Sequence, residues 1–131
     1  MTTAISDDRL TRMLEGIAAL TAVSGLVQMC AAGRVLHVLG AENTPGSRQG
    51  FATVGMFMTV IGGLQLQALH ASEPETGVVA WGATQKLGAA AAVAIGVRRG
   101  VFSRLALLVS AQDAASGVLA VAWCVRQRRR T

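Results

Sequence analysis

The segment 77–97, GVVAWGATQKLGAAAAVAIGV, is the feature that most restricts how this chain folds. A helix needs about 20 mainly apolar residues to cross the hydrocarbon core of a bilayer, and this segment has that length. Its only charged residue is Lys86, near the middle. A second apolar segment, 101–125, carries Asp113 at the same depth. The pattern predicts two neighbouring transmembrane helices with opposite charges halfway across.

The distribution of charge along the rest of the chain favours the same fold class. Only 15% of the residues are charged, and they are concentrated between apolar blocks. A soluble helical bundle would carry a polar stripe along each helix, and a membrane barrel would alternate polar and apolar residues. Neither pattern is present. We therefore predict one all-α domain, 1–131, an integral membrane four-helix bundle with short loops and spans at about 13–33, 51–69, 77–97 and 104–125.

Local signals predict where these helices begin and end. Ser6 is a candidate N-cap before the first span. That span is expected to continue as an interfacial extension, 34–39, with Gly40 as its stop. The composition of segment 41–50, AENTPGSRQG, predicts a loop. Segment 72–75, which includes a proline, is expected to start the third helix.

The aromatic residues indicate where each membrane–water interface crosses the predicted helices. In four antiparallel spans, Trp81 and Trp123 reach one side of the membrane, whereas Phe51 and Phe102 reach the other. Aromatic residues are enriched at both membrane interfaces. The sequence therefore predicts two sparse aromatic belts.

Arginine counts decide the orientation only weakly. The termini and second loop share one side, which carries six arginines, Arg9, Arg12, Arg126, Arg128, Arg129 and Arg130. The other side has five, Arg34, Arg48, Arg98, Arg99 and Arg104. The dense cluster near the C-terminus favours cytoplasmic termini under the positive-inside rule. We predict a multi-pass protein of the cell (inner) membrane of a bacterium.

Lys86 and Asp113 are predicted to form a buried ion pair. A charged side chain at the bilayer centre costs at least about 2.5 kcal/mol, and pairing offsets that cost. Polar side chains expected nearby are those of Gln28, Gln85, Gln112 and, less directly, Glu15, for which an interfacial position is preferred. The pair either fixes which helices face each other or takes part in proton transfer, ion binding or anchoring of a polar head group.

Small residues mark the helix faces expected to pack closely. Gly55, Thr59, Gly62 and Gly63 form a ridge on the second span, and Gly82 and Gly117 lie close to the two charges. Ala18, Ala22 and Gly25 form a similar face on the first span. Such faces let helix backbones approach each other. They also suit a partner helix, so a homo-oligomer or a subunit of a larger membrane complex is expected.

The remaining motifs exclude several classes of site. Cys30 and Cys124 are expected to be buried thiols on opposite sides of the midplane, too far apart for a disulfide. No residues are spaced as metal ligands or as a catalytic nucleophile and base, so no metal, catalytic residue or cofactor is predicted. Bound lipid or quinone stays open as a ligand. The positive charge lacks the basic stripe of a nucleic-acid-binding protein.

The lysine in QKLGAA and the aspartate in SAQDAASGVLA, with the glycine-rich second span, resemble features of small four-helix membrane proteins of bacteria. The chain is loosely similar to the DoxX-like group. The resemblance implies the same four-span topology over nearly the whole length. Some DoxX-type proteins are associated with quinone-linked oxidoreductase complexes. No redox motif matches, and no functional residue is carried over.

Three functions remain open at this level. The first is a non-enzymatic accessory or scaffold subunit that packs its small-residue faces against partner helices or copies of itself. The second is a small transporter or a proton or ion conduit that uses Lys86 and Asp113. The third is a quinone- or lipid-binding membrane protein. The contents of the space around the two charges distinguish them.

Overall fold

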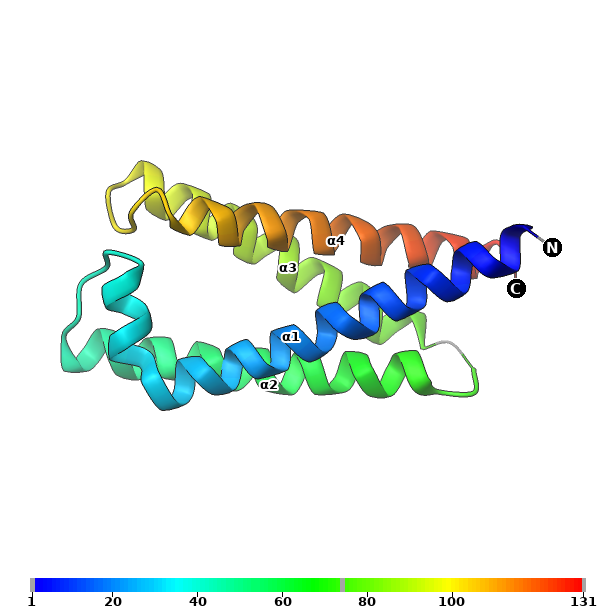
Figure 1. The fold of residues 1–131 in the computed structure, drawn as a ribbon, viewed down its shortest axis with the longest axis horizontal. Coiled ribbons are helices and arrows are strands. Elements are labelled where there is room, and N and C mark those ends of the chain that lie inside the picture. Colours follow the sequence, from blue (N-terminus) through cyan, green and yellow to red (C-terminus); the bar gives the residue numbers. More distant parts are fainter. Residues whose placement is uncertain (1, 74, 131) are drawn as a thin grey trace.

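The chain folds into four α-helices, and the computed structural model describes residues 2–73 and 75–130. The helices are α1 (Thr2–Val38), α2 (Pro45–His70), α3 (Thr76–Arg98) and α4 (Ala106–Arg128). Successive helices are antiparallel, so both termini and the α2–α3 connection lie at one end (Figure 1). All four helices are long and apolar enough to cross a membrane. The predicted all-α four-helix transmembrane bundle is confirmed.

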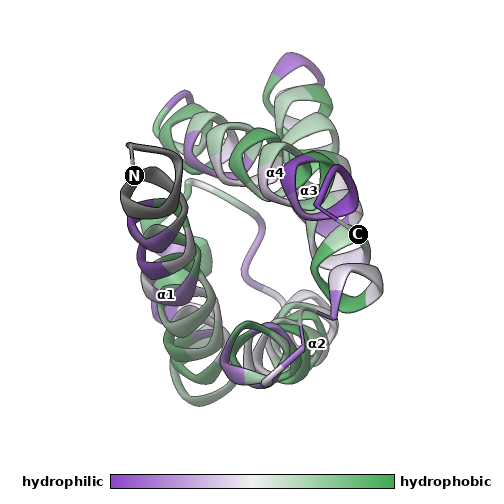
Figure 2. Cartoon of the chain, turned by 90° about the vertical axis from the view of Figure 1, so that its right-hand side faces the viewer, coloured by the Kyte–Doolittle hydropathy of each residue, from purple (hydrophilic) through white to green (hydrophobic). Residues whose placement is uncertain are grey.

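The outer surface of the bundle is apolar. Large side chains there remain exposed, including Leu108 at 69%, Val118 at 61% and Phe57 at 59%. Seen from the end that carries the termini, hydrophilic residues are concentrated towards the helix ends and hydrophobic residues along the shafts (Figure 2). Exposed apolar area on this scale is typical of a surface that contacts lipid. The chain is a multi-pass membrane protein.

The start of α2 differs from the prediction, because segment 45–50 is helical. Thr44 forms the N-cap, and its hydroxyl accepts a hydrogen bond from the backbone N–H of Ser47 at 3.2 Å. The Ser47 hydroxyl in turn accepts one from the backbone N–H of Thr44 at 2.8 Å. Pro45 fits the first turn because its missing N–H has no intrahelical partner there. The proline and glycine that predicted a turn therefore begin a helix.

One other predicted helix start is wrong, a second falls at the end of the predicted segment, and one predicted stop is confirmed. Ser6 is not an N-cap, because α1 already begins at Thr2. The predicted start of α3 at 72–75 meets the observed one at its last residue, because Glu75 is the N-cap of α3; Pro74 lies outside the described residues. Gly40 ends α1 as predicted, with φ +65°, a conformation that glycine adopts without a steric penalty. The sequence did not reveal the kink in α1 at Ala31, where φ and ψ are −135° and 34°.

Glycines bring α1 against α2, so the two helices form one hairpin. The backbones of Gly25 and Gly55 face each other so closely that a Cβ on Gly55 would lie 2.6 Å from the Gly25 carbonyl oxygen. A Cβ on Gly62 would lie 2.7 Å from the carbonyl oxygen of Ala18. The hydroxyl of Thr59 also donates across the interface to the Ala22 carbonyl of α1, at 3.4 Å. The predicted small-residue ridge therefore packs within the chain.

The other glycines differ in whether they pack against a neighbouring helix. Gly117 on α4 packs against Leu87 of α3, and Gly82 of α3 packs against the side chain of Gln65 of α2. Gly63 was predicted to belong to the ridge, but a Cβ on this residue would meet no atom of the described chain within 4 Å. It follows Gly62 directly, so it points away from the α1 interface by about 100°.

The two hairpins, α1–α2 and α3–α4, touch each other less extensively than the helices within each hairpin do (Figure 1). Their main contact is a core at the end that carries the termini. This terminal core contains Leu10, Leu14, Ala68, Val79, Ala83, Ala120, Trp123 and Cys124. At the opposite end, the backbone N–H of Ser103 donates to the Leu39 carbonyl at 2.8 Å. The bundle is therefore densely packed at one end and joined by loops at the other.

Three of the four aromatic residues assigned to belts face inwards. Trp123 is only 3% exposed and belongs to the terminal core, whereas Trp81 is 74% exposed. Phe51 and Phe102 both line a cavity between the hairpins. The heights that the sequence predicted are compatible with the topology, but only Trp81 faces the surroundings as a belt residue does. The position of a residue along a helix does not determine which way its side chain faces.

The two cysteines are free. Cys124 is buried, as predicted, and its Sγ lies 3.5 Å from the Thr76 carbonyl oxygen. Cys30 is exposed, so the prediction of a buried thiol is wrong there. Cys30 lies beside the kink of α1, where it lines an open groove with the start of α2, whereas Cys124 lies on the side of α4 that faces the terminal core.

Candidate functional site

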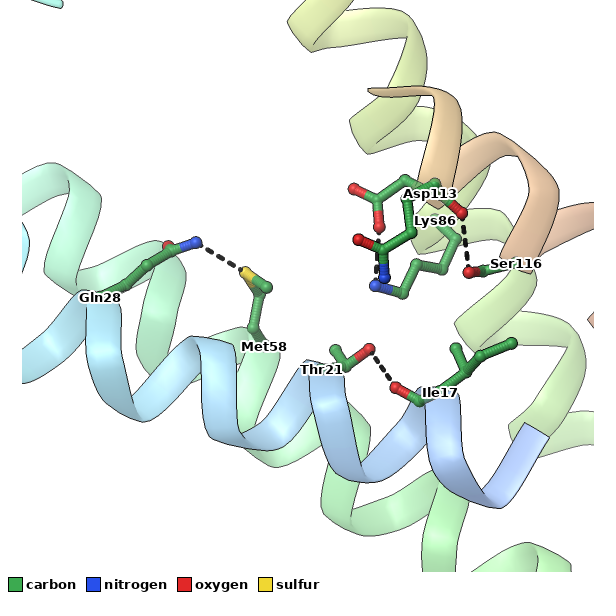
Figure 3. A network of polar contacts seen from close by, with 8 residues as sticks. Ile17, Thr21, Gln28, Met58, Lys86, Asp113 and Ser116 are labelled. Carbon is green, nitrogen blue, oxygen red and sulfur yellow. Dashed lines mark hydrogen bonds and ion pairs between the residues drawn. The ribbon is translucent and has the colours of Figure 1, made fainter. Parts of the chain in front are cut away.

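Lys86 and Asp113 form an ion pair in the interior of the bundle. Lys86 Nζ donates to Asp113 Oδ1 at 2.8 Å, and the two residues are only 4% and 8% exposed (Figure 3). They lie near the middle of α3 and α4, so the antiparallel hairpin brings them to matching depth. Pairing is what makes two charges tolerable in a low-dielectric interior. The structure thus brings together the two residues that the sequence predicted to meet.

Serines on α4 surround the pair with satisfied hydrogen bonds. Ser110 donates across the hairpin to the Ala90 carbonyl at 2.8 Å. Ser116 donates to the Gln112 carbonyl of its own helix at 2.7 Å. Ser110 and Ser116 lie one turn before and after Asp113 on the same buried face of α4, and the Ser110 hydrogen bond ties that face to α3. This face sets the position of Asp113 for Lys86.

A cavity of about 300 Å³ lies between the two hairpins and reaches both charges. Its polar lining consists of Thr21, Ser24, Gln28, Lys86, Gln112 and Asp113. Its apolar lining consists of Leu20, Val23, Val27, Val35, Leu39, Phe51, Met58 and Val109. Thr21 of α1 lies across from the ion pair, and Gln28 lies farther along the same helix (Figure 3). The cavity therefore has polar groups beside the pair and apolar walls from three helices.

A second cavity of about 140 Å³ adjoins the first on the α2–α3 side. The two share part of their lining, which includes Gln28, Met58, Val109 and Asp113. Towards the termini, the terminal core closes the space between the hairpins. Towards the lipid, the α1 wall contains Val23 and Val27, which are 56% and 49% exposed. The cavities thus form a slot between the hairpins whose α1 wall continues onto the lipid-facing surface.

Two glutamines beside these cavities have unsatisfied oxygens. The Oε1 atoms of Gln28 and Gln85 are buried and have no hydrogen-bond partner within the described chain. Gln28 Nε2 donates only to the sulfur of Met58, at 3.3 Å (Figure 3). A buried carbonyl without a donor costs about 1–3 kcal/mol. Gln112, the third predicted neighbour of the pair, is largely exposed but lines the larger cavity.

Glu15 does not belong to this polar group. Its Oε1 lies 3.7 Å from His70 Nε2, at the end of the bundle near the α2–α3 connection. The side chains of Glu15 and His70 are 29% and 65% exposed. Glu15 thus lies near an end of the bundle and apart from Lys86 and Asp113, and its place at the membrane interface stays a prediction.

Sequence reasoning missed two buried polar residues. Gln65 is 6% exposed, and its Oε1 has no partner among the described residues. It fills the space beside Gly82 and connects α2 to α3. Thr21 is 2% exposed and donates to the Ile17 carbonyl at 2.8 Å. The available signal was that polar residues inside spans face the bundle interior, which applies to Gln65 as much as to Gln28.

The fold and the buried pair define a class, a multi-pass helical membrane protein with a polar centre between two hairpins. No family model, curated protein or solved structure matches the chain. The DoxX-like resemblance therefore stays a prediction. Function has to be argued from the residues that line the slot.

Proposed function

We propose that this chain is a non-enzymatic membrane protein that binds an amphipathic molecule between its hairpins, with the polar head beside Lys86 and Asp113. One observation carries the proposal: the cavity of about 300 Å³ that reaches both buried charges from between apolar walls. Ligand sites are mostly apolar clefts of about 300–1,000 Å³ with a few placed polar groups. An amphiphile from the surrounding lipid matches this combination.

The size of the cavity supports a head group with the first part of its chain. An engineered apolar cavity of about 150 Å³ holds benzene, and the larger cavity here has about twice that volume. Val23 and Val27 line the cavity and are also half exposed, so a hydrocarbon tail can lie along α1 into the lipid. A lipid-dissolved ligand can therefore enter the site directly from the membrane, without crossing water.

The small-residue faces no longer favour the scaffold function. It depended on small-residue faces that would receive partner helices. Gly25, Gly55 and Gly62 are occupied by the α1–α2 contact, and Gly117 is occupied by Leu87. An accessory subunit or homo-oligomer would need a different surface. A proton or ion conduit would use the same cavity. Between the Lys86–Asp113 pair and the end that carries the termini, however, the space is filled by the terminal core.

The location remains a proposal as well. We place the protein in the inner membrane of a bacterium with both termini in the cytoplasm. The arginines in the last turn of α4 and just after it, at residues 126–130, support this orientation.

A cavity-filling variant tests the proposed function. Val109 lines both cavities, so Val109→Phe occupies the shared space. Val118→Phe is the matched control on the same helix, because Val118 is 61% exposed and lines neither cavity. Each protein is extracted from cell membranes, and retained amphiphiles are counted by native mass spectrometry. We expect the wild type and Val118→Phe to retain a molecule that Val109→Phe loses. Equal retention by both variants, with both folded, contradicts the proposal.

A further inference from the structure

The charges that face the slot restrict the kind of head group it accepts. Among the residues lining the two cavities, Lys86 and Asp113 are the only acidic or basic side chains. They are bound to each other at 2.8 Å, so their charges cancel locally. A head with its own net charge would be desolvated there without a free counter-ion, and burying an unpaired charge is strongly unfavourable. The slot therefore favours an uncharged head.

The hydrogen-bonding groups restrict the head further. Gln28 lines both cavities and Gln85 lines the smaller one, and each has an Oε1 without a donor in the described structure. A carbonyl oxygen accepts hydrogen bonds and cannot donate them. Because both residues line the slot, a ligand bound there lies beside their side chains. A head that donates hydrogen bonds would satisfy both oxygens, whereas an ester or ether head would leave them unpaired.

From these two observations we infer that the ligand of this slot is an uncharged amphiphile with a hydroxyl-bearing head, held by the side-chain oxygens of Gln28 and Gln85 beside the Lys86–Asp113 pair. The inference rests on the proposed function and specifies its ligand class. The head is of the glycerol or sugar type, and the ion pair stays intact when the ligand is bound.

Four probes with the same decyl chain test this inference. Decylglycerol offers two hydroxyl donors, and its dimethyl ether offers none. Decyl phosphate and decyltrimethylammonium carry a negative and a positive charge. Binding is measured by native mass spectrometry of the full chain in phosphatidylcholine nanodiscs, because maltoside detergents carry hydroxyl-bearing heads and would compete. We expect decylglycerol to bind at least about tenfold more tightly than each of the others, the combined effect of two neutral hydrogen bonds.

Substitutions of Gln28 and Gln85 test whether these two residues cause the preference for decylglycerol over its dimethyl ether. In Gln28→Leu/Gln85→Leu, decylglycerol and its dimethyl ether are expected to bind equally. This double variant should fold, because replacing an unpaired buried polar group by an apolar group of similar shape is nearly neutral. Its thermal unfolding in the same nanodiscs is compared with that of the wild type. Gln67→Leu, at an exposed position on α2 away from both cavities, is the matched control and should keep the preference.

The outcomes separate the inference from the function beneath it. Equal binding of decylglycerol and its ether by the wild type overturns the inferred head chemistry and leaves amphiphile binding in place. Tightest binding of either charged probe also overturns it. A diol preference that persists in the folded double variant overturns the role of the two glutamines. Failure of all four probes to bind overturns the inference and the proposed function together.

Discussion

The indole N–H of Trp123 donates to the hydroxyl oxygen of Thr11 at 3.0 Å, joining the end of α4 to the beginning of α1. Residues 112 positions apart thereby connect the two hairpins at the end where the terminal core closes the bundle. The slot lies farther along the helices, where the hairpins are less closely packed. The Trp123–Thr11 hydrogen bond is therefore part of what keeps the hairpins together while leaving the slot free.

Replacing Trp123 by Phe should destabilise the bundle at this end. The substitution removes the hydrogen bond and some buried area, and leaves the Thr11 hydroxyl without this donor. A neutral hydrogen bond contributes about 1 kcal/mol, so we expect a loss of about 1–2 kcal/mol in the free energy of unfolding. Thr11→Val provides the double-mutant cycle. If the two substitutions are fully additive, the hydrogen bond does not couple the hairpins.

Removing one member of the buried ion pair should be far more costly. Lys86→Met leaves the Asp113 carboxylate without its cation in the interior. Breaking a buried pair in this way costs about 3–5 kcal/mol, measurable as a shift in denaturant-induced unfolding in detergent micelles. The double variant Lys86→Met/Asp113→Leu should recover most of the loss because no charge remains. A single variant as stable as the wild type would show that the pair does not stabilise the α3–α4 hairpin.

Two glycines on α2 should respond in opposite ways to the same substitution. In Gly55→Ala the new methyl group meets the Gly25 carbonyl oxygen, so α1 and α2 must move apart. Overpacking of this kind costs about 1–3 kcal/mol. Gly63→Ala meets no atom and gains helix propensity, about 1 kcal/mol in water. Thermal unfolding of the two variants checks this difference. Equal destabilisation would mean that the α1–α2 interface is not where the structure places it.

The Glu15–His70 contact should contribute little to stability. The side chain of His70 is 65% exposed, and its Nε2 lies 3.7 Å from Glu15 Oε1. Solvent screens such a pair, and exposed ion pairs contribute about 0–1 kcal/mol. We expect Glu15→Gln to change the unfolding free energy by less than about 0.5 kcal/mol and to leave amphiphile retention unchanged. A large loss of either property would place Glu15 in the polar centre after all.

Much of the fold could be read from hydropathy, because a bilayer requires each span to be apolar over a defined length. Four spans and their antiparallel order follow from that requirement. The ends of the helices were less predictable. The Pro45–Gly46 dipeptide suits both a turn and a first helical turn, and the Thr44–Ser47 capping box decided between them. The kink at Ala31 has no proline or glycine at the residue itself to signal it.

The sequence determined that Lys86 and Asp113 would lie at matching depth, because depth depends only on the distance along each span. It also indicated which faces carry small residues, because that follows from the helical repeat. Only the tertiary structure decided the rotation of each helix and the separation of the hairpins. These depend on side-chain packing between distant segments, such as Trp123 on Thr11 and Gln65 beside Gly82. The slot and its two unsatisfied glutamine oxygens arise from that packing, which no single span encodes.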